Sequence, residues 1–500
     1  MPDDCVGDDP KLIRRAGLVL RPDPRRVITK QFLPGQEMLT HGISRADAVI
    51  NRVLAMTDEQ VSLTLAATQR RFADRHHDLR TTFADHFGLV EHRLPETVEP
   101  SAERRALIGA YCTQEYSVEA AALFNPSIVA HPDQTSLAAD DLRFVMSVRG
   151  VGEGHISSVE FRTGVVDASD HVQIDPPGRH LVTGRAAPAT MAREFLREAL
   201  VDRADAAAAD DILSLLPDHF DPAQLDAALA SFGRDSLTQL HADAIVDRIR
   251  WIASCNYRLH FPPDRALSER VLYPTSPAES HGIEDARFTR FIDDDGSVTY
   301  YGTYTAFDGS HVAPHLVETT DFETFEMTQL NGPAAKNKGM ALFPRKVGGQ
   351  FLALSRWDRE SIDVASAADV HKWDGTVTVH APRQPWELIQ LGNCGAPIET
   401  AEGWLVLTHG VGPMREYGIG AILLDLDEPT KTIAELSEPI LAPTDEEREG
   451  YVPNVVYSCG ALVHHETLIM PYGCSDSAIR FAFIDMPELL KRLGTSRSRR

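Results

Sequence analysis

The pattern of apolar and polar positions predicts helices in the first quarter of the chain. Apolar residues recur at helical spacing over residues 44–56, where Ser44 is well placed as an N-cap, and again over residues 57–83 and 101–116. The second of these begins with Thr-Asp-Glu-Gln, which supplies a cap and acids for the first turn. We expect residues 1–122 to form a mostly helical region that carries no chemistry of its own.

Beyond this region the apolar pattern changes to the period of two that is typical of β-strands. Residues 144–148 and 157–162 are predicted as strands, and helical spacing returns in a segment rich in Ala, Leu, Asp and Arg. Short strands and turns such as Asp308-Gly309 then alternate to the end. The predicted parts are a helical region, 1–122; a first β part, 123–186; a helical insertion, 187–256; a second β part, 257–492; and a flexible tail, 493–500.

Charge and composition limit the partners that the chain is expected to have. The formal net charge of −24 would repel the phosphates of nucleic acids and the headgroups of an anionic membrane. No apolar run is long enough to cross a bilayer, and the first residues lack the pattern of a signal peptide. The 6 cysteines lack CxxC spacing, as expected of reduced thiols. We expect a cytoplasmic protein that binds neither nucleic acid nor membrane, and we leave a homo-oligomer open.

Residues 282–288, Gly-Ile-Glu-Asp-Ala-Arg-Phe, place two carboxylates and an arginine at the start of a predicted strand. An acidic turn at residues 293–296 and an aromatic strand at 297–305 follow, as in a β-hairpin. A carboxylate beside an arginine can present an acid to a sugar. The same segment is also consistent with a surface ion pair between Asp285 and Arg287.

Four further segments of the β parts combine polar residues with apolar surroundings. Arg356 and His409 lie within apolar strands, where an unpaired charge is costly. His409 is also consistent with a core histidine bound to the backbone, and the Lys-Asn-Lys-Gly turn at 336–339 with a solvated loop. In chain order the segments are Phe-Asn-Pro-Ser at 124–127; the basic turn 336–339 with Leu-Phe-Pro-Arg-Lys at 342–346 and Leu-Ser-Arg-Trp at 354–357; Gly-Ala-Pro-Ile at 395–398 with Gly-Trp-Leu-Val-Leu-Thr-His-Gly-Val at 403–411; and Gly-Tyr-Val-Pro-Asn-Val-Val-Tyr-Ser-Cys-Gly at 450–460 with Tyr-Gly-Cys-Ser-Asp at 472–476.

In these five segments and their order, the chain resembles glycoside hydrolase family 130, the β-mannoside phosphorylases and β-1,2-mannosidases. The resemblance covers the first β part and everything from about Leu272, but neither helical region. It implies a mainly β fold, a five-bladed β-propeller, to which this chain adds an N-terminal helical region and a helical insertion. It also implies an active site at the end of the central channel, where loops from different blades meet.

The resemblance further implies roles for individual residues. Asp285 matches the catalytic acid, which acts through a hydroxyl of the bound sugar while inorganic phosphate attacks with inversion. Arg149 matches an active-site arginine, and Glu284 is expected either to bind a sugar hydroxyl or to turn away. The residues that match phosphate-binding positions are Lys336, Asn337, Lys338, Arg356 and His409; those that match positions for the mannosyl unit are Asn125, Ser127 and Asp476. The aromatic candidates for stacking on a sugar are Trp404, Tyr304, Tyr417 and Tyr472.

Some positions depart from the family pattern. Ala286 stands where the acid motif usually has proline, and Thr408 where a tyrosine usually precedes the His-Gly pair. Residues 147–164 differ from the commoner short form and add Glu153 and His155, which either rim the pocket or serve a hydrolase as base. These departures bear on the acceptor sugar and the linkage more than on the fold.

The expected function is inverting phosphorolysis of β-1,2- or β-1,4-linked manno-oligosaccharides, which releases mannose 1-phosphate. Phosphate is expected as a co-substrate without a metal or other cofactor, because the sequence shows no metal-ligand spacing and no nucleotide loop. Two alternatives stay open. One is a β-1,2-mannosidase that uses water, and the other is a propeller that binds carbohydrate without catalysis.

Overall fold

The computed structural model describes residues 9–35, 43–201, 206–231 and 239–494. These residues are mainly β with some helices, and they form two units. The larger unit comprises the described residues of Met1–Pro22, Ala121–Pro177 and Thr183–Arg500, and the smaller one comprises those of Asp23–Ala120 and Gly178–Val182.

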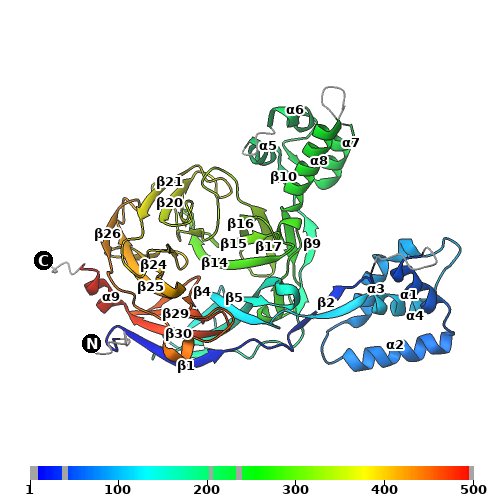
Figure 1. Ribbon diagram of the computed structural model, residues 1–500, viewed down its shortest axis with the longest axis horizontal. Coiled ribbons are helices and arrows are strands. Elements are labelled where there is room, and N and C mark those ends of the chain that lie inside the picture. Colours follow the sequence, from blue (N-terminus) through cyan, green and yellow to red (C-terminus); the bar gives the residue numbers. More distant parts are fainter. Residues whose placement is uncertain (1–8, 36–42, 202–205, 232–238, 495–500) are drawn as a thin grey trace. The chain divides into compact units, whose positions relative to one another are not determined.

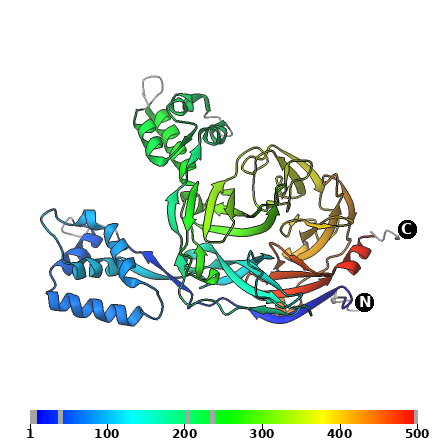
Figure 2. The ribbon, with the colours of Figure 1, turned by 180° about the vertical axis from the view of Figure 1, so that it is seen from behind.

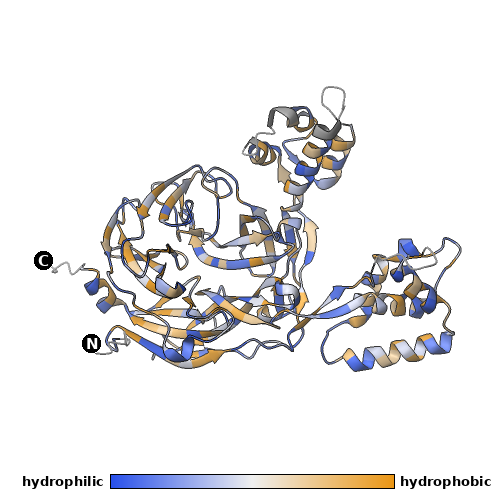
Figure 3. Ribbon diagram, in the orientation of Figure 1, coloured by the Kyte–Doolittle hydropathy of each residue, from blue (hydrophilic) through white to orange (hydrophobic). Residues whose placement is uncertain are grey.

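The smaller unit consists of four α-helices and a two-stranded antiparallel sheet. Its elements are α1 (Arg45–Leu54), α2 (Asp58–Phe72), α3 (Leu79–Gly88), α4 (Ala102–Tyr111), β2 (Val27–Gln31) and β3 (Thr113–Ser117). The helices bury one face each, with Val53, Leu65, Phe83 and Leu107 among the residues of their common core. Figure 3 shows the corresponding alternation of hydrophobic and hydrophilic residues along α2.

The caps explain where the helices of the smaller unit begin and end. The predictions of α1 and of its Ser44 cap are confirmed, since the Ser44 side chain accepts from the Asp47 N–H. The single helix predicted over residues 57–83 is wrong. α2, which starts with a capping box at Thr57, ends at Phe72, and α3 begins behind a new N-cap, Asp78, whose side chain accepts from the Thr81 N–H.

Besides a two-stranded sheet in its helical insertion, the described part of the larger unit contains a twelve-stranded sheet and three smaller sheets, which Figures 1 and 2 show one after another in chain order. The strands of the first are β4 (Ala122–Ala130), β5 (Leu142–Val151), β6 (Ser157–Val166), β7 (Val172–Ile174), β8 (Val182–Thr183), β9 (Arg185–Pro188), β12 (Tyr257–His260), β13 (Arg270–Leu272), β14 (Gly282–Ile292), β15 (Val298–Phe307), β16 (Val312–Thr319) and β17 (Thr324–Gln329). The hairpin predicted around residues 293–296 is confirmed, because β14 and β15 pair antiparallel on either side of it.

The three smaller sheets follow toward the C-terminus. The four-stranded sheet contains β18 (Ala341–Leu342), β19 (Phe351–Ser355), β20 (Ile362–Ala367) and β21 (Gly375–His380). The next contains β22 (Gln390–Asn393), β23 (Ile398–Thr400), β24 (Gly403–Val411), β25 (Tyr417–Leu424) and β26 (Thr432–Glu435). The last contains β27 (Val456–Tyr457), β28 (Leu462–His464), β29 (Thr467–Cys474), β30 (Ala478–Asp485) and, paired with β30, β1 (Ile13–Leu20). The short helix α9 (Met486–Arg492) follows β30, and β4 of the first sheet contacts β29 of the last.

Between β9 and β12 the chain forms a helical insertion with its own hydrophobic core. Its elements are β10 (Met191–Ala192), α5 (Arg193–Val201), α6 (Ala206–Ser214), β11 (His219–Phe220), α7 (Pro222–Ser231) and α8 (Gln239–Ser254). Leu196, Ile212, Leu225 and Ile249 pack together inside it. The insertion leaves and rejoins the sheet at one edge, because β9 pairs with β12 and β12 pairs with β17. Within the described ranges, no helix is long and apolar enough to span a membrane.

Candidate active site

A polar cavity of about 230 Å³ in the larger unit gathers side chains that are far apart in the sequence. Eight residues singled out from the sequence line it: Asn125, Arg149, Asp285, Lys338, Arg356, His409, Tyr417 and Asp476. They lie in or next to strands of the first sheet, the four-stranded sheet and the two five-stranded sheets, so the fold brings all five motifs to a single place, two of them from the first sheet.

Two β-bulges direct Asn125 and Asp285 into the cavity. The register of β4 against β5 shifts between Phe124 and Ser127, and that of β14 against β15 shifts between Glu284 and Arg287. Asn125 and Asp285 both have positive φ angles, 48° and 55°. A bulge re-aims a side chain that would otherwise follow the alternation of the strand. As a result Asn125 Nδ2 donates to Asp285 Oδ1 over 2.6 Å.

Cations surround the two carboxylates of the acid motif. Arg149 donates from Nη1 to Asp285 Oδ1 over 2.8 Å and from Nη2 to Glu284 Oε1 over 2.7 Å. Lys338 Nζ donates to Glu284 Oε2 over 2.5 Å. Burial opposes ionisation of Asp285, but Arg149, Lys338 and Arg287 outweigh it and lower the pKa of that carboxyl. Asp285 is therefore ionised in this structure.

Arg287 has a different partner from the one the ion-pair interpretation requires. It is 2% exposed, and its Nη2 donates to Tyr457 Oη over 2.6 Å and to the Asn393 carbonyl over 3.3 Å. The hypothesis of a surface ion pair between Asp285 and Arg287 is wrong, because Asp285 pairs with Arg149 and Arg287 is buried.

Arg356 and His409 form a hydrogen-bonded pair in the cavity. Arg356 Nη1 donates to His409 Nε2 over 3.3 Å, which leaves the proton of the ring on Nδ1, facing the Asn393 carbonyl at 3.2 Å. Burial and the charges of Arg356 and Arg287 lower the pKa of His409 well below its usual value. His409 is thus neutral, and it orients the Arg356 guanidinium instead of adding a charge to it.

Asp476 is the second carboxylate that lines the cavity. It follows β29 with a φ of 50°. Burial and the charge of Asp285 raise its pKa to about 7, and Arg149 and Arg415 offset only part of that rise. Asp285 and Asp476 therefore differ in charge state near neutral pH, although both are aspartates in one cavity. The sequence gives no sign of this difference, because it depends on which cations the fold places beside each carboxylate.

The other residues singled out from the sequence do not line the cavity. Ser127 is buried beneath the bulges, where its Oγ accepts from the Phe288 N–H over 3.0 Å and ties β4 to β14. Tyr304 is buried and donates to Glu279 Oε1 over 2.6 Å. Trp404 and Tyr472 are fully buried core residues, and Glu284 lies behind Arg149 and Lys338.

The side chains of the basic turn at residues 336–339 lie partly in the cavity and partly on the surface. Lys338 lines the cavity, whereas Lys336 is exposed, with its Nζ 5.8 Å from the centre of the Trp357 ring. Asn337 donates to the Trp357 carbonyl over 2.5 Å and accepts from Arg359 Nε over 3.0 Å. Asn337 therefore stabilises the turn that follows Arg356.

Gln390 and Arg415, which lie outside the five motifs, also line the cavity, as does Tyr457, a residue of the fifth motif that was not predicted to belong to the site. The Tyr457 phenol lies against Arg287, and burial raises its pKa. Arg415 has a φ of 58° at the tip between β24 and β25. A signal for Arg415 exists in the sequence, since it follows a Gly-Val-Gly that also occurs at residues 150–152.

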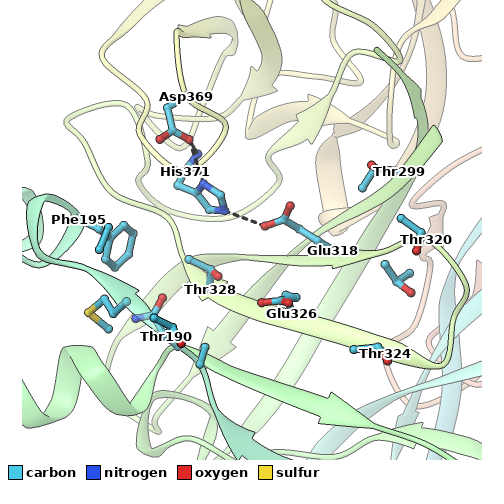
Figure 4. Close-up of a pocket in the computed structure, with 15 residues that line it drawn as sticks. Thr190, Phe195, Thr299, Glu318, Thr320, Thr324, Glu326, Thr328, Asp369 and His371 are labelled. Atoms are coloured by element: carbon cyan, nitrogen blue, oxygen red, sulfur yellow. Dashed lines mark hydrogen bonds and ion pairs between the residues drawn. The ribbon is translucent and has the colours of Figure 1, made fainter. Parts of the chain in front are cut away.

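A larger cavity, of about 540 Å³, lies between α5 and the strands β16 and β17 (Figure 4). Its charged side chains all take part in ion pairs. His371 bonds to Asp369 over 2.9 Å and to Glu318 over 2.7 Å, and Glu326 pairs with Arg258. Burial opposes protonation of His371, but Asp369 and Glu318 outweigh it and raise its pKa to about 9. Eight of the residues predicted from the sequence as site residues line the smaller cavity, and none of the predicted residues lines this one. In the described part of the chain, no cluster of His, Cys, Asp and Glu is suited to hold a metal ion.

Comparison with known proteins identifies a family for this chain. A family profile of glycoside hydrolase family 130, described as beta-1,4-mannooligosaccharide phosphorylase, matches residues 263–494. The beta-1,2-mannobiose phosphorylase of Listeria innocua is 36% identical over 241 residues, which are 47% of this chain and 65% of that enzyme, slightly less than two thirds. The 1,2-beta-oligomannan phosphorylase of Thermoanaerobacter sp. is 33% identical over 227 residues, 45% of this chain and 75% of that enzyme.

Among solved structures, the Listeria innocua beta-1,2-mannobiose phosphorylase in complex with beta-1,2-mannobiose aligns with a TM-score of 0.46 and 24% identity. This alignment covers 76% of the present chain and 93% of the other. The family assignment rests on the sequence matches, which include Asp285, Lys338, Arg356, His409 and Asp476 within the profile range. The chain belongs to glycoside hydrolase family 130.

Proposed function

We propose that this protein is an inverting glycoside phosphorylase that acts on β-mannosides and releases mannose 1-phosphate. The observation that carries the proposal is the charge of the cavity. In a chain with a formal net charge of −24, the lining contains four cationic side chains, Arg149, Lys338, Arg356 and Arg415, against two carboxylates. An anionic co-substrate needs such a set of charge-assisted donors, whereas water does not.

We further propose that the larger unit is a five-bladed β-propeller. β6 and β14 pair only between Ser157 and Gly282, which supports treating the twelve-stranded sheet as two blades, β4–β7 and β14–β17. The three smaller sheets supply the other blades, and β1 joins the last one beside β30. In this arrangement the cavity lies where the blades meet, as expected of a propeller active site.

In the proposed reaction a phosphate oxygen attacks C1 of the mannosyl unit while the C1–O bond to the leaving saccharide breaks. Asp285 supplies a proton to the leaving oxygen through a hydroxyl of the sugar, and HPO₄²⁻ gives up its own proton as it becomes the phosphate ester, which restores the acid. Inversion converts the β-mannoside into α-mannose 1-phosphate. No other reactant is required.

The ionised state of Asp285 is compatible with this role. A general acid must be protonated when the bond breaks. The cations Arg149 and Lys338 lower the Asp285 pKa, and a phosphate dianion bound beside them would compensate part of their field. Phosphate binding therefore raises the Asp285 pKa and favours the protonated carboxyl. Asp285 carries the proton that it donates only when phosphate and the mannoside are both bound.

Lys338 and Arg356 are the proposed phosphate-binding cations, and the neutral His409 positions the Arg356 guanidinium. Asn125 and Asp476 are the proposed contacts of the mannosyl unit, because both line the cavity, where Asn125 bonds to Asp285 and Asp476 lies within the electrostatic influence of Asp285 and Arg149. Cys112, Cys394, Cys459 and Cys474 are buried thiols that form no disulfide, which supports a reducing, cytoplasmic setting for the enzyme.

The test is incubation of the protein with β-1,2-mannobiose and with its β-1,4-linked counterpart, each with and without phosphate. Mannose 1-phosphate formed only in the presence of phosphate supports the proposal, and the preferred disaccharide identifies the linkage. Free mannose formed at equal rates without phosphate would instead indicate the β-1,2-mannosidase. Absence of turnover with every β-mannoside would indicate a binding protein.

A further inference from the structure

Two hairpins of the larger unit have the same unusual turn. Gly-Val-Gly at residues 150–152 leads from β5 into the 3-10 turn Glu153–His155, and Gly-Val-Gly at 410–412 leads from β24 into Pro413–Arg415. The backbone angles agree closely, since Gly152 has φ −101° and ψ −163° and Gly412 has φ −104° and ψ −164°. The third residues of the two turns, His155 and Arg415, have φ angles of 60° and 58°.

The correspondence extends to the cavity. Arg149 and His409 stand directly before the two Gly-Val-Gly segments, and both line the cavity. Arg415, at the tip of the second hairpin, lines it as well. His155 occupies the equivalent place at the tip of the first hairpin. A side chain other than glycine held in the left-handed region stores strain, which at equivalent positions beside an active site points to a functional contact.

A hydrogen bond fixes His155 to a second segment at the cavity. His155 Nδ1 and Tyr451 Oη are 2.8 Å apart, and the two rings lie 6.0 Å from each other. Tyr451 itself is held between cavity residues. Its N–H donates to Ser477 Oγ over 2.7 Å, next to Asp476, and its neighbour Val452 lines the cavity. The pair therefore joins the first hairpin to the segment that carries the lining residue Val452, although neither ring is itself part of the lining.

We propose that His155 and Tyr451 bind the saccharide that leaves in phosphorolysis, which is the acceptor sugar of the reverse reaction. The inference rests on the proposed function. Nucleophile and leaving group lie on opposite faces of the sugar in an inverting displacement. The proposed phosphate cations Lys338 and Arg356 come from the segments around β18 and β19, whereas His155 lies in the turn between β5 and β6 and Tyr451 precedes β27. A saccharide that departs away from the cations meets the pair.

The chemistry of the pair suits a neutral pyranose. Tyr451 is 48% exposed and His155 is exposed, so an aromatic face and the imidazole are open to a ligand. The bond between the two side chains uses Nδ1 of His155 and leaves Nε2 directed elsewhere, as a donor or acceptor for a sugar hydroxyl. Neither residue takes part in the bonds that hold Asp285, so they contact the acceptor and not the reacting atoms.

The experiment measures synthesis from mannose 1-phosphate and free mannose with His155→Gly, His155→Asn and Tyr451→Phe. Glycine tolerates a φ of 60° without strain, so His155→Gly removes the imidazole and spares the turn. We expect it to raise the KM for the acceptor about threefold to tenfold, the value of one hydrogen bond, with the KM for mannose 1-phosphate unchanged. His155→Asn should restore part of the loss. Met414→Ala, at the 89% exposed tip of the other hairpin, is the matched control and should behave as wild type.

Three results would contradict the inference in distinguishable ways. If the acceptor KM of His155→Gly and Tyr451→Phe equals that of wild type, the pair does not bind the acceptor, although the proposed function stands. If both KM values rise together, the hairpin supports the whole cavity and is not an acceptor site. If the wild-type protein forms no product in either direction, the proposed function fails, and this inference fails with it.

Discussion

Asn125 Nδ2 donates to Asp285 Oδ1 over 2.6 Å, although 160 positions separate the two residues in the chain. Each lies in a β-bulge and has a positive φ angle. The two bulges therefore act together, because each turns one polar side chain out of the alternation of its strand and toward the other. Ser127 and Phe288 join the same two strands by a second bond, which fixes the spacing of the pair.

Asp285→Asn should abolish phosphorolysis while leaving the fold intact. The amide keeps the size of the side chain but removes the transferable proton, which is worth roughly a hundredfold to ten-thousandfold in rate. The measurement is the release of mannose 1-phosphate, with circular dichroism to confirm folding. Asp294→Asn, an exposed aspartate in the turn of the same hairpin, should keep wild-type activity. Normal turnover by a folded Asp285→Asn protein would exclude Asp285 as the acid.

Arg356→Ala should raise the KM for phosphate much more than that for the mannoside. A charge-assisted bond to a buried anion is worth roughly 1.5–3 kcal/mol, which corresponds to a factor of about 10 to 150. The informative comparison is Lys336→Ala, which removes an exposed cation outside the cavity lining and should change neither constant. Equal effects of the two substitutions would show that long-range charge, and not a defined contact, attracts phosphate.

The activity should depend on the ionisation of Asp476 near neutral pH. Its pKa is raised to about 7, so the carboxyl gains a proton as the pH falls below that value and becomes a poorer acceptor for sugar hydroxyls. We expect kcat/KM for the mannoside to decrease from pH 8 to pH 6, about one unit on either side of that pKa. The corresponding limb should be absent from the pH profile of Asp476→Asn. A profile of unchanged shape in that variant would assign the limb to another group.

His371 should make the stability of the larger unit depend on pH in the alkaline range. Its folded-state pKa, about 9, exceeds the ordinary value of 6.5, so the folded state binds the proton more tightly than the unfolded state. The stabilisation is fully present below pH 6.5 and is lost as the pH rises through 9. With allowance for solvent screening it amounts to about 1–2 kcal/mol.

The measurement compares the melting temperatures of wild type and His371→Gln between pH 6 and pH 10, a range that brackets both of these pKa values. The wild type should melt higher below pH 6.5 and lose that advantage above pH 9. A constant difference between the two proteins across this range would mean that His371 stabilises by packing alone.

Removal of the smaller unit should leave the active site in place. Asp23 donates its N–H to Glu119 over 2.8 Å, so the two ends of the unit are close enough for residues 24–118 to be replaced by a short Gly-Ser linker. This excision preserves β1, which pairs with β30, and β4, which carries Asn125. We expect the shortened protein to fold and to retain turnover. A folded but inactive product would show that the smaller unit contributes to catalysis.

The sequence by itself determined local features of secondary structure, such as caps and turns, and the set of charged and polar residues available for a site. Ser44 and Thr57 cap helices because their side chains bond to N–H groups only three residues away, and the turn after Ile292 follows from its own aspartates and glycine. The acid motif and the basic residues before and within the strands were likewise visible in order along the chain. These features depend on neighbours in the sequence, which is why the pattern of residues predicts them.

Only the tertiary structure decided which of these residues share a cavity and in what charge state. Strand periodicity assigns alternate faces, so it cannot show that bulges turn Asn125 and Asp285 inward or that Tyr304 faces the core. Nor does any local pattern show that Arg356 and burial keep His409 neutral. The physical reason is that side-chain direction, desolvation and Coulomb interaction depend on neighbours from other strands, and the packing of the sheets alone brings those neighbours together.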